Sequence, residues 1–297
     1  MLTKIKGIIA LSRWIEVYDF TLALTFITVL FAGGWAGTRL IAIITANFLA
    51  MIYAFMINDV EDAIEDAEDP KKKKRNPISN GSLTRQEGWL VANVTLILSL
   101  LIFAYIAYTI GNASVLIAGA ASLLISFLYS WRKVRLKAIP IIDVLTHMYM
   151  LSGAIFVTSY LAYTPNLTTP GWIAFISMMF VSGYGQLDNE IRDFVVDKKT
   201  GIKTLATIIG RKQAIVLQLV LIGIALVGFA YLGTLIIDPL GFITKYIICV
   251  IVIFLLNCLT YFKSNTTNIK VWMYRSLVLA SAATAGWLLL SGTKLIN

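Results

Sequence analysis

The sequence of 297 residues is poor in charge and in cysteine: 14% of its residues are Asp, Glu, Lys or Arg, and two are Cys. Soluble domains carry about 25% charged residues and about 45–50% apolar ones. Here the apolar share is 58% and the mean hydropathy is +0.80. These values exclude a soluble globule and a disordered chain, and they predict a polytopic membrane protein. Both cysteines, Cys249 and Cys258, fall in one apolar run, which excludes a disulfide scaffold.

A window of about 19 residues along the chain finds nine candidate membrane spans. We therefore predict an all-α protein with nine transmembrane helices. The first apolar span follows Lys4, Lys6 and Arg13 without a convincing cleavage site, so we expect an anchored helix rather than a removed signal peptide. The predicted spans are 16–34, 39–57, 89–109, 113–130, 140–163, 171–187, 213–235, 244–262 and 271–291.

The basic residues are distributed unequally between the two sides that these spans define. Of 25 Lys and Arg residues, 22 fall before the first span or in the alternate connections that share its side. Arg39, Lys245 and Lys294 fall on the other side. Because Lys and Arg are retained in the cytoplasm, we expect a plasma-membrane protein with a cytoplasmic N-terminus, a C-terminus outside and an odd number of spans. The net charge of +9 is thus explained by membrane anchoring, and we expect no nucleic-acid partner.

The acidic residues are concentrated in two short stretches, which hold 11 of the 16 Asp and Glu residues. Each stretch directly follows a predicted span on the cytoplasmic side, and each contains three carboxylates at offsets 0, 3 and 7, which place them on one helical face. Carboxylates next to hydrocarbon are costly and need compensation. Two opposed acidic faces predict an oxygen-liganded Mg²⁺ site, with Mn²⁺ as an alternative ion. The alternative interpretation is a pair of solvated, charge-rich helix ends, whose like charges would repel one another.

Basic clusters alternate with these acidic stretches along the same side of the membrane. One cluster is Lys71 to Arg75, a second follows Tyr129, and a third includes Lys198, Lys199 and Lys203. Each cluster alone is typical of positive-inside anchoring. Around paired acidic faces, however, the clusters also supply the cations that a bound diphosphate requires.

These residues resemble four motifs of the UbiA superfamily of intramembrane prenyltransferases. Asn58-Asp59-x-x-Asp62-x-x-x-Asp66 is similar to its first aspartate-rich motif, and Arg75-Asn76-Pro77-Ile78-Ser79-Asn80-Gly81 is similar to the segment that follows that motif. Tyr129-Ser130-Trp131-Arg132-Lys133 resembles the Tyr-x-x-x-Lys element. Glu190-x-x-Asp193-x-x-x-Asp197 resembles the second aspartate-rich motif, with Glu190 where many members have Asp. The four motifs occur in the family's order.

The resemblance implies a helical bundle around a cavity that opens to lipid, and a cytoplasmic cap that holds a diphosphate. It implies one domain over residues 1–297, with the cap formed by 58–88 and 188–212. The implied metal ligands are Asn58, Asp59, Asp62, Asp66, Glu190, Asp193 and Asp197. The implied catalytic residues are Asp59, Asp62, Asp193, Asp197 and Lys133. The implied substrate-binding residues are Arg75, Tyr129, Lys133, Lys137, Asn189, Arg192, Lys203 and His147.

Three functions remain open from the sequence. The first is transfer of a prenyl group from an allylic isoprenoid diphosphate, through an allylic cation, to a lipophilic acceptor in the membrane. The second is a cyclase of the same architecture, in which the cation reacts with its own chain. The third is a cation-coupled transporter, although transporter sites usually lie near the membrane centre.

The acceptor and the role of one intramembrane residue are also open. The segments 69–77 and 140–143 resemble the lycopene elongase-like branch more than the hydroxybenzoate branch, but quinone precursors and the glycerol lipids of the archaeal branch remain alternatives. His147 is the sole histidine and lies four residues after Asp143 within a predicted span. It either faces the substrate or donates a helix-to-helix hydrogen bond.

Overall fold

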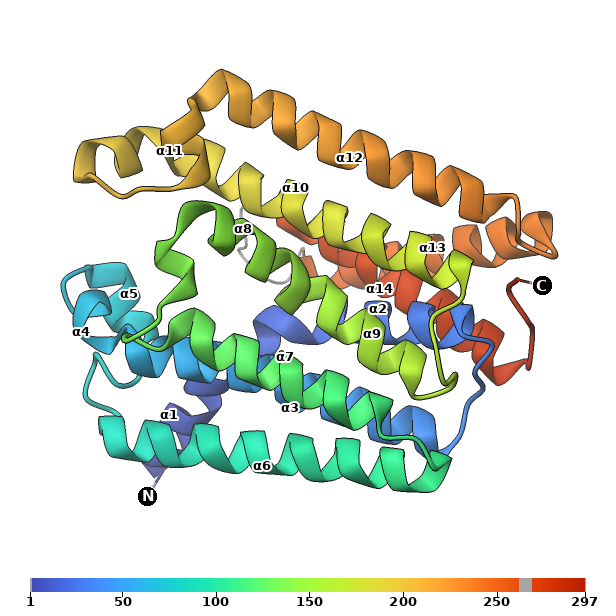
Figure 1. Cartoon of the computed structure of the whole chain (residues 1–297), viewed down its shortest axis with the longest axis horizontal. Coiled ribbons are helices and arrows are strands. Elements are labelled where there is room, and N and C mark those ends of the chain that lie inside the picture. Colours follow the sequence, from blue (N-terminus) through green and yellow to red (C-terminus); the bar gives the residue numbers. More distant parts are fainter. Residues whose placement is uncertain (1, 262–268, 297) are drawn as a thin grey trace.

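The computed structural model describes residues 2–261 and 269–296, and in these ranges the chain is helical apart from an isolated bridge between Ile236 and Ile296. The all-α prediction is confirmed. Figure 1 shows the long helices packed side by side along one direction, with the N-terminus near α1 and the C-terminus at the opposite end. The short helices α4, α5 and α11 gather at the first of these ends.

Each predicted span coincides with a long helix or, in one case, with a helix interrupted by a wide turn. The interrupted helix consists of α8 (Pro140–Met148), the π-helix η2 (Tyr149–Gly153) and α9 (Ala154–Leu161). The other long helices are α2 (Trp14–Phe31), α3 (Thr38–Glu61), α6 (Arg85–Ile110), α7 (Ser114–Ser130), α10 (Thr169–Thr200), α12 (Arg211–Gly233), α13 (Pro239–Tyr261) and α14 (Ile269–Leu290). The short ones are α1 (Leu2–Ser12), α4 (Ala63–Asp66), α5 (Pro70–Arg75), the 3-10 helix η1 (Leu136–Ala138) and α11 (Leu205–Ile209).

Six of these segments are long and apolar enough to cross a membrane, namely α2, α3, α6, the α8–α9 segment, α12 and α13. Two shorter apolar stretches lie in α7 and at residues 275–290 of α14. The helix α10 is longer than its predicted span and continues to Thr200 through a charged segment. An integral membrane protein is confirmed, whereas the count of nine crossings stays a prediction.

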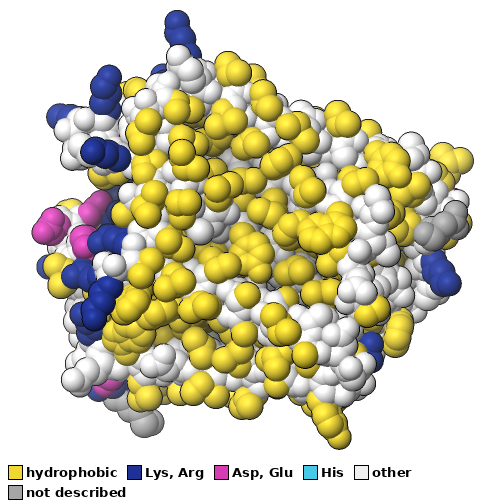
Figure 2. Space-filling view, in the orientation of Figure 1, with side chains coloured by type: hydrophobic (Ala, Val, Ile, Leu, Met, Phe, Trp, Pro, Cys, Tyr) yellow, Lys and Arg dark blue, Asp and Glu magenta, His cyan; other side chains and the backbone are white. Residues whose placement is uncertain are grey.

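The surface divides into an apolar belt and charged ends. In Figure 2 hydrophobic side chains cover the middle of the face, and most Lys and Arg side chains gather at the end that holds α4, α5 and α11. Outward-facing residues such as Leu124 and Val227 are more than half exposed, as lipid-facing side chains are. The sequence also places Lys263 and Lys270 on the cytoplasmic side. Lys263 lies outside the described residues, and so does the side chain of Lys270. Cys249 is buried and free, and the side chain of Cys258 lies outside the described part.

Polar side chains connect the helices inside the bundle. The Asn47 amide of α3 donates to Thr25 Oγ1 of α2 at 3.1 Å and to Ser159 Oγ of α9 at 2.8 Å, and its oxygen accepts a 2.7 Å bond from Thr158. Each such interhelical hydrogen bond stabilises a membrane bundle by about 0.5–2 kcal/mol. The Asn47 network therefore fixes α2, α3 and α9 relative to one another.

Close packing between α6 and α7 depends on one glycine. A Cβ atom at Gly119 would lie 2.4 Å from the ring of Phe103, and that ring is fully buried. The two helices approach this closely because Gly119 has no side chain.

We expect Gly119→Ala to lower the stability of the bundle by about 1–3 kcal/mol, because the buried ring has to shift. The control is Gly223→Ala in α12, where an added Cβ meets no atom within 4 Å. Thermal unfolding in detergent should show a lower Tm for the first variant only. Equal melting temperatures for the two variants would contradict the packing described.

Candidate functional site

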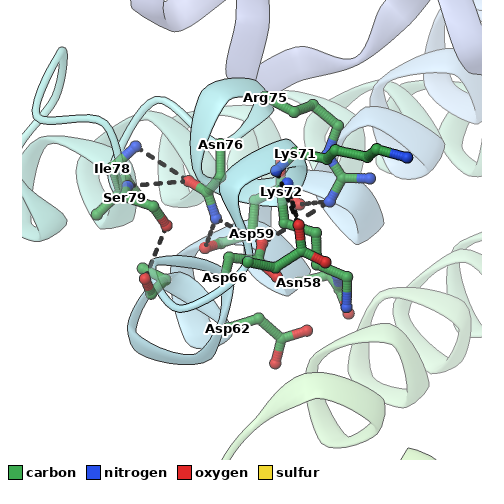
Figure 3. A network of polar contacts seen from close by, with 12 residues as sticks. Asn58, Asp59, Asp62, Asp66, Lys71, Lys72, Arg75, Asn76, Ile78 and Ser79 are labelled. Atoms are coloured by element: carbon green, nitrogen blue, oxygen red, sulfur yellow. Dashed lines mark hydrogen bonds and ion pairs between the residues drawn. The ribbon is translucent and has the colours of Figure 1, made fainter. Parts of the chain in front are cut away.

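Asn76 is the centre of a hydrogen-bond network that joins the first acidic stretch to the segment after it (Figure 3). We call this the Asn76 network. The side-chain nitrogen of Asn76 donates to the backbone oxygen of Asp59 at 2.8 Å and to Asp66 Oδ2 at 3.0 Å. Its side-chain oxygen accepts from the backbone N–H of Ile78 at 3.0 Å. Asn76 is fully buried, so these bonds are shielded from water. They hold α4 and α5 against the end of α3.

Two arginines from different parts of the chain approach the buried carboxylate of Asp59. Arg13 lies 3.4 Å from Asp59 Oδ1, and Arg75 lies 3.5 Å from the same oxygen. Arg13 has a left-handed backbone with φ +47° between α1 and α2, and its guanidinium stacks on Phe55 at 4.5 Å and pairs with Glu16. The other oxygen, Asp59 Oδ2, is buried and has no hydrogen-bond partner.

Lys137 holds the other two members of the first motif. Its ammonium group lies 2.8 Å from Asn58 Oδ1 and 2.5 Å from Asp62 Oδ2. Arg135 adds a second ion pair with Asp62, at 3.4 Å. Burial lowers the pKa of Lys137, and the neighbouring Asp62 carboxylate acts in the opposite direction. All four predicted ligands of the first motif thus lie at one end of the bundle, each in contact with a cation or with Asn76.

The structure separates the two lysines that follow Tyr129. Lys137 lies in the acidic site, as described, but Lys133 is exposed, with its ammonium group 5.6 Å from the ring of Trp131. Tyr129 is half-buried, and its hydroxyl donates a 2.8 Å bond to Asp143. The next residue, Ser130, lies 3.4 Å from Asn58 of the first stretch, and Asp143 also accepts a bond from Gln186, one helical turn before Glu190 of the second. Tyr129 therefore lies between the two acidic stretches.

The second acidic stretch continues from the end of the predicted span in α10. Glu190 is buried; its Oε2 accepts a 2.9 Å bond from the backbone N–H of Ala206 in α11, and its Oε1 has no partner. Burial raises the pKa of Glu190 to about 7, and the charges of Asp143 and Asp197 act in the same direction. Asp193 is exposed, so the shared helical face turns from the protein interior at Glu190 to the surface.

Asp197 lies one helical turn after Asp193 and is partly buried. Its pKa is raised by burial and by the charge of Asp193, whereas the charge of Lys72 in α5 opposes this shift. Lys72 therefore lies within electrostatic range of Asp197. Of the remaining predicted substrate ligands, Arg192 bonds Asn189 at 2.7 Å on the exposed side of α10, and Lys203 is exposed in the following loop. His147 is half-buried, one helical turn after Asp143.

The residue types fit a divalent cation, although no three acidic, histidine or cysteine side chains converge on one point in the described ranges 2–261 and 269–296. Among these residues the buried carboxylate oxygens without a partner are Asp59 Oδ2 and Glu190 Oε1, one in each predicted motif. A buried anionic oxygen without a partner is costly unless a cation binds it. Carboxylates with an amide oxygen, from Asn58, make up the oxygen-rich ligand set that Mg²⁺ prefers.

The motifs do not reveal three of the residues that complete this site. Arg13 belongs to the cluster before the first span, which positive-inside anchoring explains equally well. Gln186 donates a 2.9 Å bond to Asp143 Oδ2 and thereby joins α10 to α8. The available signal for Asp143 was its position: an acidic residue within an apolar span is a functional candidate.

Comparison with known proteins decides the family. Residues 21–292 match the model of the UbiA prenyltransferase family. The chain belongs to this family. The fold agrees, because a UbiA homologue from Archaeoglobus fulgidus bound to GPP and Mg²⁺ superposes with a TM-score of 0.72 and 19% identity, over 96% of this chain and 99% of that one.

Two further relatives of this UbiA-family chain are informative. A structure of digeranylgeranylglyceryl phosphate synthase in membranes has a TM-score of 0.64 and 19% identity, over 97% of this chain and 99% of that one. The C(50) beta-cyclic carotenoids biosynthesis protein LbtBC of Dietzia sp. (strain CQ4) is 23% identical over 181 residues. That alignment covers 60% of this chain and 41% of the relative, so it spans less than half of the relative's length.

Asn76→Ala should lower the free energy of unfolding by about 1–3 kcal/mol, because it leaves the Asp59 carbonyl and the Asp66 carboxylate without their buried donor. Limited proteolysis should cut residues 63–80 faster in this variant, and the Tm should fall. Asn80→Ala is the matched control, since Asn80 is exposed in the same loop and its side chain bonds Lys74 and Ser82 but neither α3 nor α4. If both variants resist proteolysis equally, the hydrogen bonds of Asn76 do not hold α4 and α5 against α3.

Proposed function

We propose that this protein is a Mg²⁺-dependent prenyltransferase that moves a prenyl group from an allylic isoprenoid diphosphate to a lipophilic acceptor within the membrane. The observation that carries this proposal is the pair of acidic stretches at one end of an apolar bundle, each with a buried carboxylate oxygen that lacks a partner. Family membership supports the transferase chemistry. The similar fold of the archaeal homologue that binds GPP and Mg²⁺ supports the substrate class and the ion.

The carboxylates and Asn58 would hold the metal. The proposed ligands are Asn58, Asp59, Asp62, Asp66, Glu190, Asp193 and Asp197. Mg²⁺ bound there would neutralise charge on the diphosphate as it leaves. Asp59, Asp62, Asp193 and Asp197 are accordingly the proposed catalytic carboxylates, and Mn²⁺ is an alternative ion.

The cations around the site would bind the phosphate oxygens. Arg75 and Lys137 each contact a carboxylate of the first motif, so a diphosphate can replace that carboxylate as their partner. Arg13, which also contacts Asp59, joins this set. We retain Lys133 as a proposed catalytic residue, since its flexible side chain is exposed beside the site. The other proposed substrate ligands are Tyr129, Asn189, Arg192, Lys203 and His147.

The interior of the described bundle contains two cavities lined mainly by apolar side chains. One small cavity lies between α3, α7 and α9 and includes Met51, Ser126 and Thr158 in its wall. A second, of about 160 Å³, lies towards the other end of the bundle between α2, α9, α10 and α12. Ala174, in its wall, is 16 residues from Glu190, or about 24 Å along α10 at 1.5 Å per residue. An allylic cation formed near the acidic end would be shielded from water.

The balanced reaction needs no redox partner. The bond between the allylic carbon and the diphosphate oxygen breaks, and its electron pair leaves with the diphosphate. An electron-rich acceptor then forms a new bond to the allylic carbon and loses a proton to a base. We propose a carotenoid as acceptor, supported by the similarity to a carotenoid biosynthesis protein. A quinone precursor and a glycerol lipid are the alternatives that an acceptor assay has to include.

The test combines purified protein with labelled allylic diphosphates and the three acceptor classes, in the presence of Mg²⁺ or of a chelator. We expect Mg²⁺-dependent product and diphosphate release, and a loss of about 100-fold or more in kcat for Asp59→Asn and for Asp193→Asn. Asp238→Asn is the control, because Asp238 caps the start of α13 away from the acidic site.

Two other outcomes would indicate a different function. Product that forms without any acceptor would indicate a cyclase. Absence of product together with positive counterflow in proteoliposomes would indicate a transporter. Either result would overturn the proposal.

We further propose that residues 1–297 form one domain with nine crossings in the plasma membrane, with the N-terminus and the acidic site in the cytoplasm. The excess of Lys and Arg at the acidic end supports this orientation. A cysteine introduced at Ser82, in a background without Cys249 and Cys258, should react with an impermeant maleimide only in opened vesicles or cells. A cysteine introduced at Gly37 should react in intact cells. The reverse pattern would contradict the orientation.

A further inference from the structure

The carboxylate of Asp143 makes two short hydrogen bonds with neutral side chains from two other helices. Asp143 Oδ1 accepts from the Tyr129 hydroxyl of α7 at 2.8 Å, and Asp143 Oδ2 accepts from Gln186 Nε2 of α10 at 2.9 Å. Asp143 itself lies in the first turn of α8 and is 8% exposed. We call Tyr129, Asp143 and Gln186 the Asp143 cluster.

This cluster lies between the two acidic stretches. Tyr129 precedes Ser130, whose hydroxyl is 3.4 Å from Asn58 Oδ1 of the first stretch. Gln186, the second donor to Asp143, lies one helical turn before Glu190 of the second stretch in α10. The hydroxyl of Tyr129 is therefore placed where both proposed metal-binding segments meet.

Asp143 lacks the ion pair that other buried aspartates make. Asp19 pairs with Arg275 at 3.5 Å, and Asp59 pairs with Arg13 at 3.4 Å. Within the described residues, no Lys or Arg lies within 4 Å of the Asp143 carboxylate. Two neutral donors satisfy its oxygens but leave its negative charge uncancelled at short range.

The direction of the Tyr129 hydrogen bond has a chemical consequence. A phenol has one hydrogen to donate, and Tyr129 donates it to Asp143. Its oxygen can therefore offer only lone pairs to a substrate, and the adjacent carboxylate increases the electron density on that oxygen. An oriented oxygen of this kind stabilises positive charge that develops next to it and requires no reorientation during the reaction.

We propose that Asp143 is a positioning residue that fixes the Tyr129 oxygen as an electron-rich group facing the allylic carbon while its bond to the diphosphate breaks. Gln186 fixes the rotation of the Asp143 carboxylate by holding its second oxygen. The electron pair of the broken bond leaves with the diphosphate, and the positive charge remains on the allylic carbons next to the Tyr129 oxygen. This inference rests on the proposed prenyl transfer.

The test compares Asp143→Asn, Gln186→Leu and Asp143→Glu with the unmodified protein. The control variant is Asp19→Asn, because Asp19 is also a buried acid but lies in α2, outside the Asp143 cluster. Each protein is assayed for kcat and KM with the allylic diphosphate that it uses best and with the 2-fluoro analogue of that substrate. Fluorine withdraws electrons and makes the allylic cation harder to form. Affinity for inorganic diphosphate with Mg²⁺ is measured separately.

For Asp143→Asn we expect kcat to fall about 10- to 100-fold, while KM and the affinity for diphosphate change by less than about threefold. Fluorination should slow Asp143→Asn by a larger factor than the unmodified protein, because the variant has lost stabilisation of the cation. The kcat and fluorine effect of Gln186→Leu should lie between those of Asp143→Asn and the unmodified protein. Asp143→Glu keeps the charge and should recover part of the kcat that Asp143→Asn loses.

Three results would overturn the inference: a loss in Asp143→Asn no larger than in Asp19→Asn, a rise in KM with unchanged kcat, or an equal fluorine effect in Asp143→Asn and the unmodified protein. Failure of the proposed function looks different, because the unmodified protein would then release no diphosphate from any allylic substrate. A variant that fails to fold is recognised by its Tm, and Gln186→Leu with Asp143→Glu then supplies the comparison.

Discussion

The architecture depends on one constraint, which is that a carboxylate next to hydrocarbon must be compensated. Asp59 at the end of α3 is fully buried, and the surrounding chain supplies what its charge requires: Arg13 from the link before α2 and Arg75 from α5. Asp62 is compensated in the same way by Lys137. The short helices at this end can therefore be understood as supports that bring cations to buried and partly buried acids.

The same compensation bears on the charged substrate proposed for this site. The cations that neutralise the carboxylates in this structure carry the charge that phosphate oxygens need, and the carboxylate oxygens that they would release are of the kind that Mg²⁺ prefers. Binding of a metal diphosphate would thus exchange one set of ion pairs for another without leaving charge unpaired. Asp59 Oδ2 and Glu190 Oε1 have no hydrogen-bond partner in this structure, and such binding would give them a partner.

Much of this could be predicted from sequence, because helical periodicity and charge placement are local properties. All nine predicted spans overlap long or interrupted helices. The helix predicted to carry the first motif is interrupted at Asp62, so Asp59 and Asp66 contact Arg75 whereas Asp62 contacts Lys137, although all lie at one end of the bundle. The lysines after Tyr129 could not be ranked, since the chain turns through a left-handed residue, Arg135 with φ +46°, which directs Lys137 rather than Lys133 to the acids. The Arg13 contact and the Asp143 cluster depend on tertiary packing, which residue spacing does not encode.

The π-helix η2 separates two tasks that a single straight helix would have to combine. Before it, α8 places Asp143 towards the acidic end of the bundle. After it, α9 contributes Thr158 to the Asn47 network and lines both interior cavities. The Ser152 hydroxyl lies within hydrogen-bond distance of the Met148 and Met178 carbonyl oxygens and so links the wide turn to α10. Because such a turn sets the rotation of one half independently of the other, the half that carries Asp143 and the half that lines the cavities can be oriented separately within one membrane crossing.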